Sequence, residues 1–140
     1  MHPHERGRMA ECLVGEFLAE RGLEPISGNW RRRLGEIDLV MRDSTSGTIV
    51  FVEVRYRGGG AHGGGLASID RHKRNRMRRA ALAWLQAHAD PDTPARIDAV
   101  AVGPTPPSGS IPSGEDGERV VVRRNGYLLE WVVSAVEEQD

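Results

Sequence analysis

The sequence has little of what disulfide scaffolds, soft-metal sites and membrane spans are built from. Cys12 is the only cysteine among 140 residues, which excludes a disulfide within the chain and a thiolate zinc site. The five histidines show no spacing typical of paired metal ligands. No segment approaches the ~20 apolar residues of a membrane-spanning helix, and the charged N-terminus lacks the apolar run of a signal peptide. We therefore expect a cytoplasmic protein.

Lysine is scarce as well, because Lys73 is the only lysine among 19 basic residues. The net charge of −1 hides an asymmetry: residues 1–80 carry fifteen basic and ten acidic side chains, whereas residues 81–140 carry four and ten. A basic excess in one part of a chain is typical of a surface that binds nucleic acid. Nucleic acid is therefore the partner that we expect.

The length of 140 residues and the hydrophobic content of 39% fit a single domain, residues 1–140, that buries a modest core. Within it, the glycine-rich segment 58–67 and the Pro-, Ser- and Gly-rich segment 103–118 are predicted to be flexible loops. The termini, 1–7 and 137–140, are predicted to be flexible too. The glycine-rich segment is not a Walker loop, because no Gly-Lys-Ser/Thr follows it.

Two runs of β-branched and aromatic residues, 35–40 and 49–57, flank a short segment of turn composition. This pattern predicts an antiparallel β-hairpin. If the loop consists of residues 44–47, Asp43 pairs with Thr48. That loop length fixes the register of the whole hairpin.

In this register Asp38 lies opposite Glu53, and Glu36 lies opposite Arg55. Side chains alternate between the two faces of a strand, so these four charged side chains are expected on one face. The apolar side chains of the hairpin are expected on the other face: Ile37, Leu39, Val52 and Val54.

The opposed carboxylates of Asp38 and Glu53 indicate a metal site. Directly opposed Cβ atoms are ~5 Å apart, and two carboxylates at that distance repel each other unless a cation, a shared proton or a guanidinium neutralises them. Two oxygen ligands, with a backbone carbonyl and waters, suit Mg²⁺ or Mn²⁺ better than zinc, and Arg55 would add a fixed positive charge. The alternative, which the residues leave open, is a Glu36–Arg55 ion pair beside two solvated carboxylates.

Basic residues gather in two further places. The helix predicted from about residue 70 to His88 carries a stripe suited to a phosphate backbone, formed by Arg71, Arg74 and Arg78. Consecutive arginines follow Trp30, an arrangement typical of single-strand binding, and Arg57 follows the hairpin: the nucleic-acid-binding candidates are Arg31, Arg32, Arg33, Arg57, Arg71, Arg74 and Arg78. Solvated charge runs without a ligand remain the alternative.

Lys73 lies one turn before Met77, on the side of its helix that should face the sheet. Its amine is therefore positioned to approach the two carboxylates. The alternative is that its aliphatic stem lies along apolar surface with the amine in water. The first helix is predicted from Arg8 to Arg21, with Glu11 roughly opposite its apolar stripe.

The strings NWRRRLGEIDLV and IVFVEVRYR resemble the YraN-type family of small, largely uncharacterised bacterial proteins, which belongs to the restriction-endonuclease-like PD-(D/E)xK superfamily. The resemblance covers nearly the whole chain and includes Ala10-Glu11, Lys73, Arg96-Ile97-Asp98 and Glu130-Trp131. It implies an α/β fold with a restriction-endonuclease-like αβββαβ core, in which helices flank a mixed central sheet. It also implies that Asp38 and Glu53 stand where the superfamily binds metal.

The resemblance further implies a metal-dependent endonuclease that acts on DNA, branched or single-stranded, with Mg²⁺ or Mn²⁺ as cofactor. Glu11 occupies the family position from which a glutamate can reach the metal. Arg55 is a departure, because the superfamily motif has lysine there, and a guanidinium does not exchange protons as a buried amine can. The catalytic candidates are therefore Asp38, Glu53, Arg55, Lys73 and Glu11. A nucleic-acid-binding module without catalysis is the alternative function, and a homodimer is left open.

Overall fold

The computed structural model describes residues 3–32, 35–56, 71–105, 114–116 and 119–136. Within them the chain forms two α-helices and seven strands. In order these are α1 (Pro3–Glu20), β1 (Leu23–Arg32), β2 (Gly35–Asp43), β3 (Ile49–Tyr56), α2 (Arg71–His88), β4 (Ala95–Pro104), β5 (Gly114–Asp116), β6 (Arg119–Arg124) and β7 (Tyr127–Val136). None of the described helices is long and apolar enough to cross a lipid bilayer.

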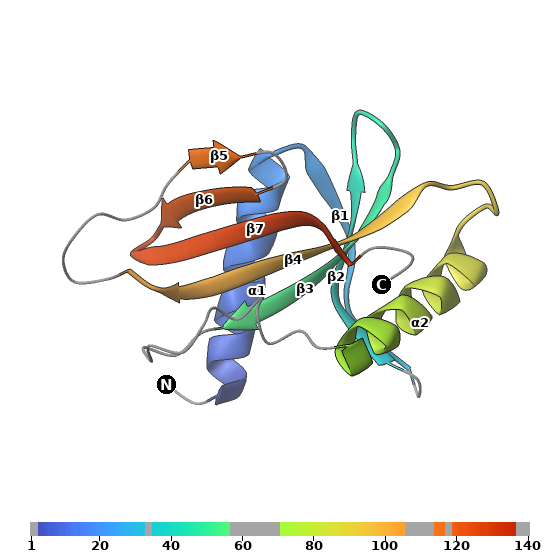
Figure 1. Cartoon of the computed structure of the whole chain (residues 1–140), viewed down its shortest axis with the longest axis horizontal. Coiled ribbons are helices and arrows are strands. Elements are labelled where there is room, and N and C mark those ends of the chain that lie inside the picture. Colours follow the sequence, from blue (N-terminus) through green and yellow to red (C-terminus); the bar gives the residue numbers. More distant parts are fainter. Residues whose placement is uncertain (1–2, 33–34, 57–70, 106–113, 117–118, 137–140) are drawn as a thin grey trace.

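The strands form one sheet in the order β1-β2-β3-β4-β7-β6-β5. Only β3 and β4 are parallel, and α2 connects them, as a parallel crossover requires. Figure 1 shows α1 crossing one face of the sheet and α2 lying beside the end formed by β2 and β4. The expected fold class is therefore confirmed: the sheet is mixed, helices flank it, and α1 to β4 form a restriction-endonuclease-like αβββαβ core.

The turn between β2 and β3 has the predicted length. The backbone N–H of Asp43 donates to the carbonyl of Thr48 at 2.8 Å, and the Asp43 carboxylate accepts from the N–H of Thr45 at 2.8 Å. Gly47 adopts a φ of 78°, which glycine takes without a steric penalty. Leu39 consequently faces Val52 along the ladder, so the predicted register is confirmed where β2 and β3 pair.

Two apolar layers cover the faces of the sheet. The layer under α1 contains Leu39, Val52 and Val54, as predicted. Ile37 is an exception, because it packs with Val40, Phe51 and Met77 in the layer under α2. Since Ile37 and Val40 share a face although they are three residues apart, β2 rotates between them, and the prediction that Ile37 joins Leu39 is wrong.

Other boundaries differ from the predictions by a few residues. The first helix begins at Pro3 rather than Arg8, because proline is tolerated in the first helical turn, where its missing N–H leaves no bond unmade. The segment 103–118, predicted to be a loop, contains the end of β4 and the strand β5. The glycine-rich segment 58–67 lies outside the described residues.

Asp98 joins β4 to β7 from the interior of the fold. Its fully buried carboxylate accepts hydrogen bonds from Arg96 Nε at 3.0 Å, from Trp131 Nε1 at 3.0 Å and from the N–H of Ser134 at 2.9 Å. The register of β4 and β7 shifts beside Asp98, and Ser134 has a φ of 54°. The carboxylate thus supplies an acceptor where regular ladder bonds are interrupted.

Candidate active site

The sheet forks where the predicted carboxylates lie. The ladder between β2 and β3 runs as far as Leu39 and Val52. Beyond it, β2 continues with β1, where Ile37 pairs with Trp30, and β3 continues with β4, where Glu53 pairs with Ala99. Asp38 and Glu53 are the next residues after the last pair of the ladder, so they lie at the point where the two strands separate. This point, marked by Asp38 and Glu53, is called the fork.

A backbone hydrogen bond holds Asp38 in the fork. Its Oδ2 accepts from the N–H of Val54 at 2.8 Å, a backbone donor that a continued β2–β3 ladder would have used. The carboxylate is thereby fixed against the strand that carries Glu53. Its second oxygen keeps lone pairs with which it can accept further bonds or bind a cation.

Glu53 is buried in the fork, with only 5% of its surface exposed. Lys73 Nζ lies 3.0 Å from its Oε1, and Arg55 Nη1 lies 3.9 Å from the same oxygen. With Asp38, which interacts with Glu53, the structure therefore brings together four of the predicted catalytic side chains. The alternative in which both carboxylates are solvated is wrong for Glu53, because a residue at 5% exposure is almost withdrawn from water.

Close packing of α2 on β2 makes the Lys73 contact possible. A Cβ atom on Gly35 would lie 2.6 Å from the carbonyl oxygen of Arg76, so only glycine lets the strand approach the helix backbone this closely. Met77, one turn after Lys73, is buried under the helix. The side of α2 that carries Lys73 consequently faces the sheet, as the helical period predicts.

The pKa of the Glu53 carboxyl is raised to about 7, mainly by burial and next by repulsion from the neighbouring Asp38 carboxylate, while the Lys73 ammonium opposes both effects. A hydrogen bond shared with Asp38 also favours the protonated form. The site therefore holds a carboxyl whose charge is only partly compensated near neutral pH. A proton or an additional cation would complete the compensation.

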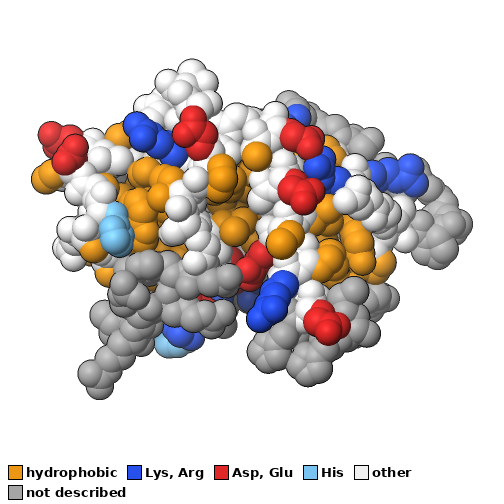
Figure 2. Space-filling view, turned by 180° about the vertical axis from the view of Figure 1, so that it is seen from behind, with side chains coloured by type: hydrophobic (Ala, Val, Ile, Leu, Met, Phe, Trp, Pro, Cys, Tyr) orange, Lys and Arg blue, Asp and Glu red, His pale blue; other side chains and the backbone are white. Residues whose placement is uncertain are grey.

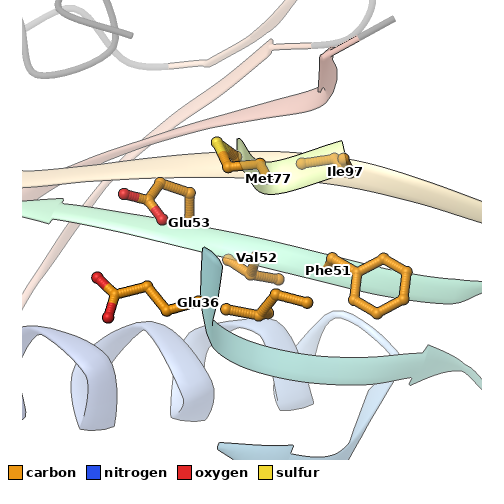
Figure 3. A pocket seen from close by; sticks show the side chains of 7 residues that line it. Glu36, Phe51, Val52, Glu53, Met77 and Ile97 are labelled. Carbon is orange, nitrogen blue, oxygen red and sulfur yellow. The ribbon is translucent and has the colours of Figure 1, made fainter. Parts of the chain in front are cut away.

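A small cavity of about 10 Å³, room for roughly one water molecule, adjoins the fork and is lined by Glu36, Ile37, Phe51, Val52, Glu53, Met77 and Ile97. In Figure 3 the carboxylates of Glu36 and Glu53 lie at the same end of this cavity, while Phe51 and Ile97 close the other end. The acidic end of the cavity thus adjoins side chains of the apolar layer beneath α2.

The donor set suits a hard divalent cation. Among the described residues, no three His, Cys, Asp or Glu side chains gather closely enough to hold a metal ion by themselves. Mg²⁺, however, usually keeps several waters and is bound through one or two carboxylates. Asp38 and Glu53 supply that number, so the residues present fit Mg²⁺ or Mn²⁺ and do not fit zinc, which prefers nitrogen and sulfur ligands.

The predicted nucleic-acid residues are only partly described. Arg71 is exposed at the start of α2, and Arg74 and Arg78 are half-buried. Arg78 donates to the Asn75 side chain at 2.8 Å, and the buried Nε of Arg74 has no hydrogen-bond partner among the described residues. The backbones of Arg31 and Arg32 belong to β1, but their side chains, together with Arg33 and Arg57, lie outside what the structure describes.

On the molecular face shown in Figure 2, Lys and Arg side chains are interspersed with Asp and Glu. The side chains drawn there do not form the one-sided basic surface that the charge asymmetry predicts. Glu11 is half-buried on α1, which covers the face opposite α2. Its part in the site stays a prediction.

Sequence reasoning missed three features of the site: the fork, the burial of Glu53, and the Val54 N–H that holds Asp38. Gly35, directly before Glu36, was the one available signal, because a glycine at the start of a strand indicates close approach of another backbone. The other two features depend on where β2 and β3 part. The point where β2 and β3 separate depends on the pairing of β2 with β1, so it cannot be predicted from the hairpin sequence alone.

Comparison with known proteins identifies the relatives of this chain. The model of the uncharacterised protein family UPF0102 matches residues 10–102. A UPF0102 protein of Methylococcus capsulatus is 41% identical over 95% of this chain and 91% of its own length. A UPF0102 protein of Pseudomonas syringae is 37% identical over 95% of this chain and 94% of its own length. These matches confirm the resemblance to the YraN-type family of uncharacterised bacterial proteins.

Proposed function

The chain belongs to the uncharacterised protein family UPF0102, and we propose that it is a metal-dependent nuclease that hydrolyses phosphodiester bonds in branched or single-stranded DNA. The observation that carries the proposal is the meeting of opposite charges at the fork. Asp38 and Glu53 arrive there from different strands, and two cationic side chains, Lys73 and Arg55, lie 3.0 Å and 3.9 Å from the same oxygen of Glu53.

The carboxylates would hold the cofactor. Asp38 and Glu53 would hold Mg²⁺ or Mn²⁺, which would supply Lewis-acid polarisation of a phosphate oxygen and activation of water. The hydrogen bond from the Val54 N–H keeps Asp38 in place. Burial of Glu53 removes competing water from its carboxylate, which strengthens every electrostatic interaction at the site.

Hydrolysis of a phosphodiester forms one P–O bond from water and breaks the P–O bond to the leaving group. One product then carries a phosphate monoester and the other a hydroxyl group. Negative charge grows on the phosphate oxygens and on the leaving oxygen as this happens. Lys73 and Arg55 would stabilise that charge because both already face the fork in the folded protein, so little reorganisation is needed during the reaction.

The outer flank of α2 supports the choice of a nucleic-acid substrate. Arg71, Arg74 and Arg78 follow one another at helical spacing, starting beside the residue that contacts Glu53. Phosphate oxygens that accept hydrogen bonds from these guanidinium groups would bring the DNA backbone next to the fork.

A second candidate function is a nucleic-acid-binding module of the same fold without catalysis. Arg55 favours it, because the restriction-endonuclease-like motif has lysine at this position and arginine cannot exchange a proton near neutral pH. Lys73 could replace the missing amine from the helix. Cleavage assays separate the two candidates.

The test is cleavage of single-stranded, duplex, flap and four-way DNA in Mg²⁺ or Mn²⁺, with a chelator as blank. We expect metal-dependent products from the native protein and none from Glu53→Gln or Asp38→Asn. Asp92→Asn, which removes an exposed carboxylate from a turn, is the matched control and should cleave normally. Metal-independent binding without cleavage of any substrate would replace the nuclease with the binding module, and absence of binding would exclude both.

A further inference from the structure

Lys73 already supplies part of the positive charge that a metal would supply at the fork. Its Nζ lies 3.0 Å from Glu53 Oε1, and the Glu53 side chain is only 6% exposed. Resting on the proposed function, we propose that Lys73 is a displaceable counter-ion that competes with the divalent cation for Glu53. The same side chain would then stabilise the metal-free site and weaken metal binding.

A counter-ion is needed because the ionised carboxylate of Glu53 is buried and water cannot solvate its charge. Its buried carboxyl faces a second carboxyl, Asp38, which repels the ionised form. An uncompensated buried charge is strongly destabilising, whereas a paired one is tolerated. The ion pair with Lys73 lets the fork fold before a metal is present, without forming a complete metal site of its own.

The structure favours Lys73 over Arg55 as the group that leaves. Arg55 belongs to the same strand as Glu53 and lies farther from the shared oxygen, at 3.9 Å. The two side chains are similarly exposed, at 25% for Lys73 and 29% for Arg55, but Lys73 comes from a different element, α2, and its ammonium can turn toward water along a flexible four-carbon stem. The helix itself can stay in place, because the Gly35 backbone packs tightly against it.

Competition has a measurable consequence for affinity. An opposite charge within ~4–6 Å changes the proton affinity of a carboxyl by one to three pKa units, because the cation must be outcompeted by the incoming proton. A divalent cation faces the same opposition, with added repulsion from the ammonium. Removing the charge of Lys73 should therefore tighten Mg²⁺ or Mn²⁺ binding by about tenfold or more.

Displacement would also give the amine a second use. Once it no longer contacts Glu53, the ammonium of Lys73 would be able to pair with a phosphate group bound at the fork. Metal binding would thus make the Lys73 ammonium available when the charge of the substrate has to be stabilised. In the metal-free protein the ammonium would stay paired with Glu53.

Calorimetric titration with MnCl₂ or MgCl₂ tests the competition in the native protein and in Lys73→Gln. Arg79→Gln is the matched control, because Arg79 is exposed on the same helix and its loss changes the net charge equally. We expect at least about tenfold tighter binding in Lys73→Gln and an affinity close to native in Arg79→Gln. Equal or weaker binding in Lys73→Gln would overturn the inference while leaving the metal site intact.

The single lysine allows a second measurement on the unaltered site. Protein labelled with 13C at the lysine Cε gives one side-chain signal, from Lys73. We expect that signal to shift as MgCl₂ is added, with half of the shift reached at the calorimetric Kd, and to stay unchanged in Glu53→Gln. An unmoved signal in native protein that binds Mg²⁺ overturns the displacement. If native protein binds neither ion, the proposed function and this inference both fail.

Discussion

The buried carboxyl of Glu53 gives the metal-free protein a specific pH dependence of stability. Its pKa is about 7 in the folded state against 4.5 for an unperturbed glutamate. Between these values the folded state holds a proton that the unfolded chain has lost, so the free energy of unfolding falls as pH rises through this window. Above about pH 7 the contribution is lost, because Glu53 is ionised in both states.

The size follows from the same two values. One pKa unit corresponds to 1.36 kcal/mol, so raising the pH from 5 to 8 should remove roughly 2.5 kcal/mol of stability through Glu53 alone. The side chain is only 6% exposed, so screening by solvent does not reduce this figure much. Glu53→Gln cannot titrate and should lack this part of the decline.

The assay is urea unfolding of the native protein and Glu53→Gln at pH 5, 6, 7 and 8 in the presence of a chelator. We expect the difference between the two free energies of unfolding to change by roughly 2.5 kcal/mol across the series, with Glu53→Gln level with or above the native protein at pH 8. Asp92→Asn, which alters an exposed carboxylate, should run parallel to the native protein. Parallel curves for Glu53→Gln would refute the buried, repelled carboxyl.

Three further variants test the parts that build and serve the fork. Gly35→Ala should lower the free energy of unfolding by about 1–3 kcal/mol in urea titration, because its Cβ would lie 2.6 Å from the Arg76 carbonyl; an unchanged value would show that α2 can retreat. Asp98→Ala should cost about 3–5 kcal/mol, since it leaves the part-buried Arg96 donor and the buried Trp131 donor without this acceptor, and a cost near zero would contradict its anchoring role. Arg74→Glu with Arg78→Glu should weaken DNA binding equally for all sequences and lower the salt slope by about one per lost phosphate contact; an unchanged slope would place the DNA elsewhere.

The hairpin shows how far local sequence determines this fold. Loop length and the turn residues Asp43 and Gly47 fix the register, so the ladder from Leu39 and Val52 to the turn was predictable. The rotation of β2 that moves Ile37 to the other face was not, because it follows from pairing with β1 on the far side. Alternation of side chains holds only while both neighbours of a strand impose the same geometry.

The sequence was sufficient to predict that Asp38, Glu53 and Lys73 lie close together, but not the environment in which they lie. The helical spacing between Lys73 and Met77 was enough to predict that Lys73 faces the sheet. The hairpin register was enough to predict that Asp38 lies next to Glu53. The burial of Glu53, which raises its pKa, depends on α2 and β4 covering the fork, and both come from later parts of the chain. A pattern of charges in one hairpin carries no information about that covering.

The most direct measurement is an anomalous difference map from crystals soaked in MnCl₂, for the native protein and for Glu53→Gln. If the fork is a metal site, the native crystals will show a peak bonded to carboxylate oxygens of both Asp38 and Glu53, and the Glu53→Gln crystals will lack it. Peaks on exposed histidines alone, or no peak in native crystals with the fork open to solvent, would contradict the metal site and with it the proposed nuclease.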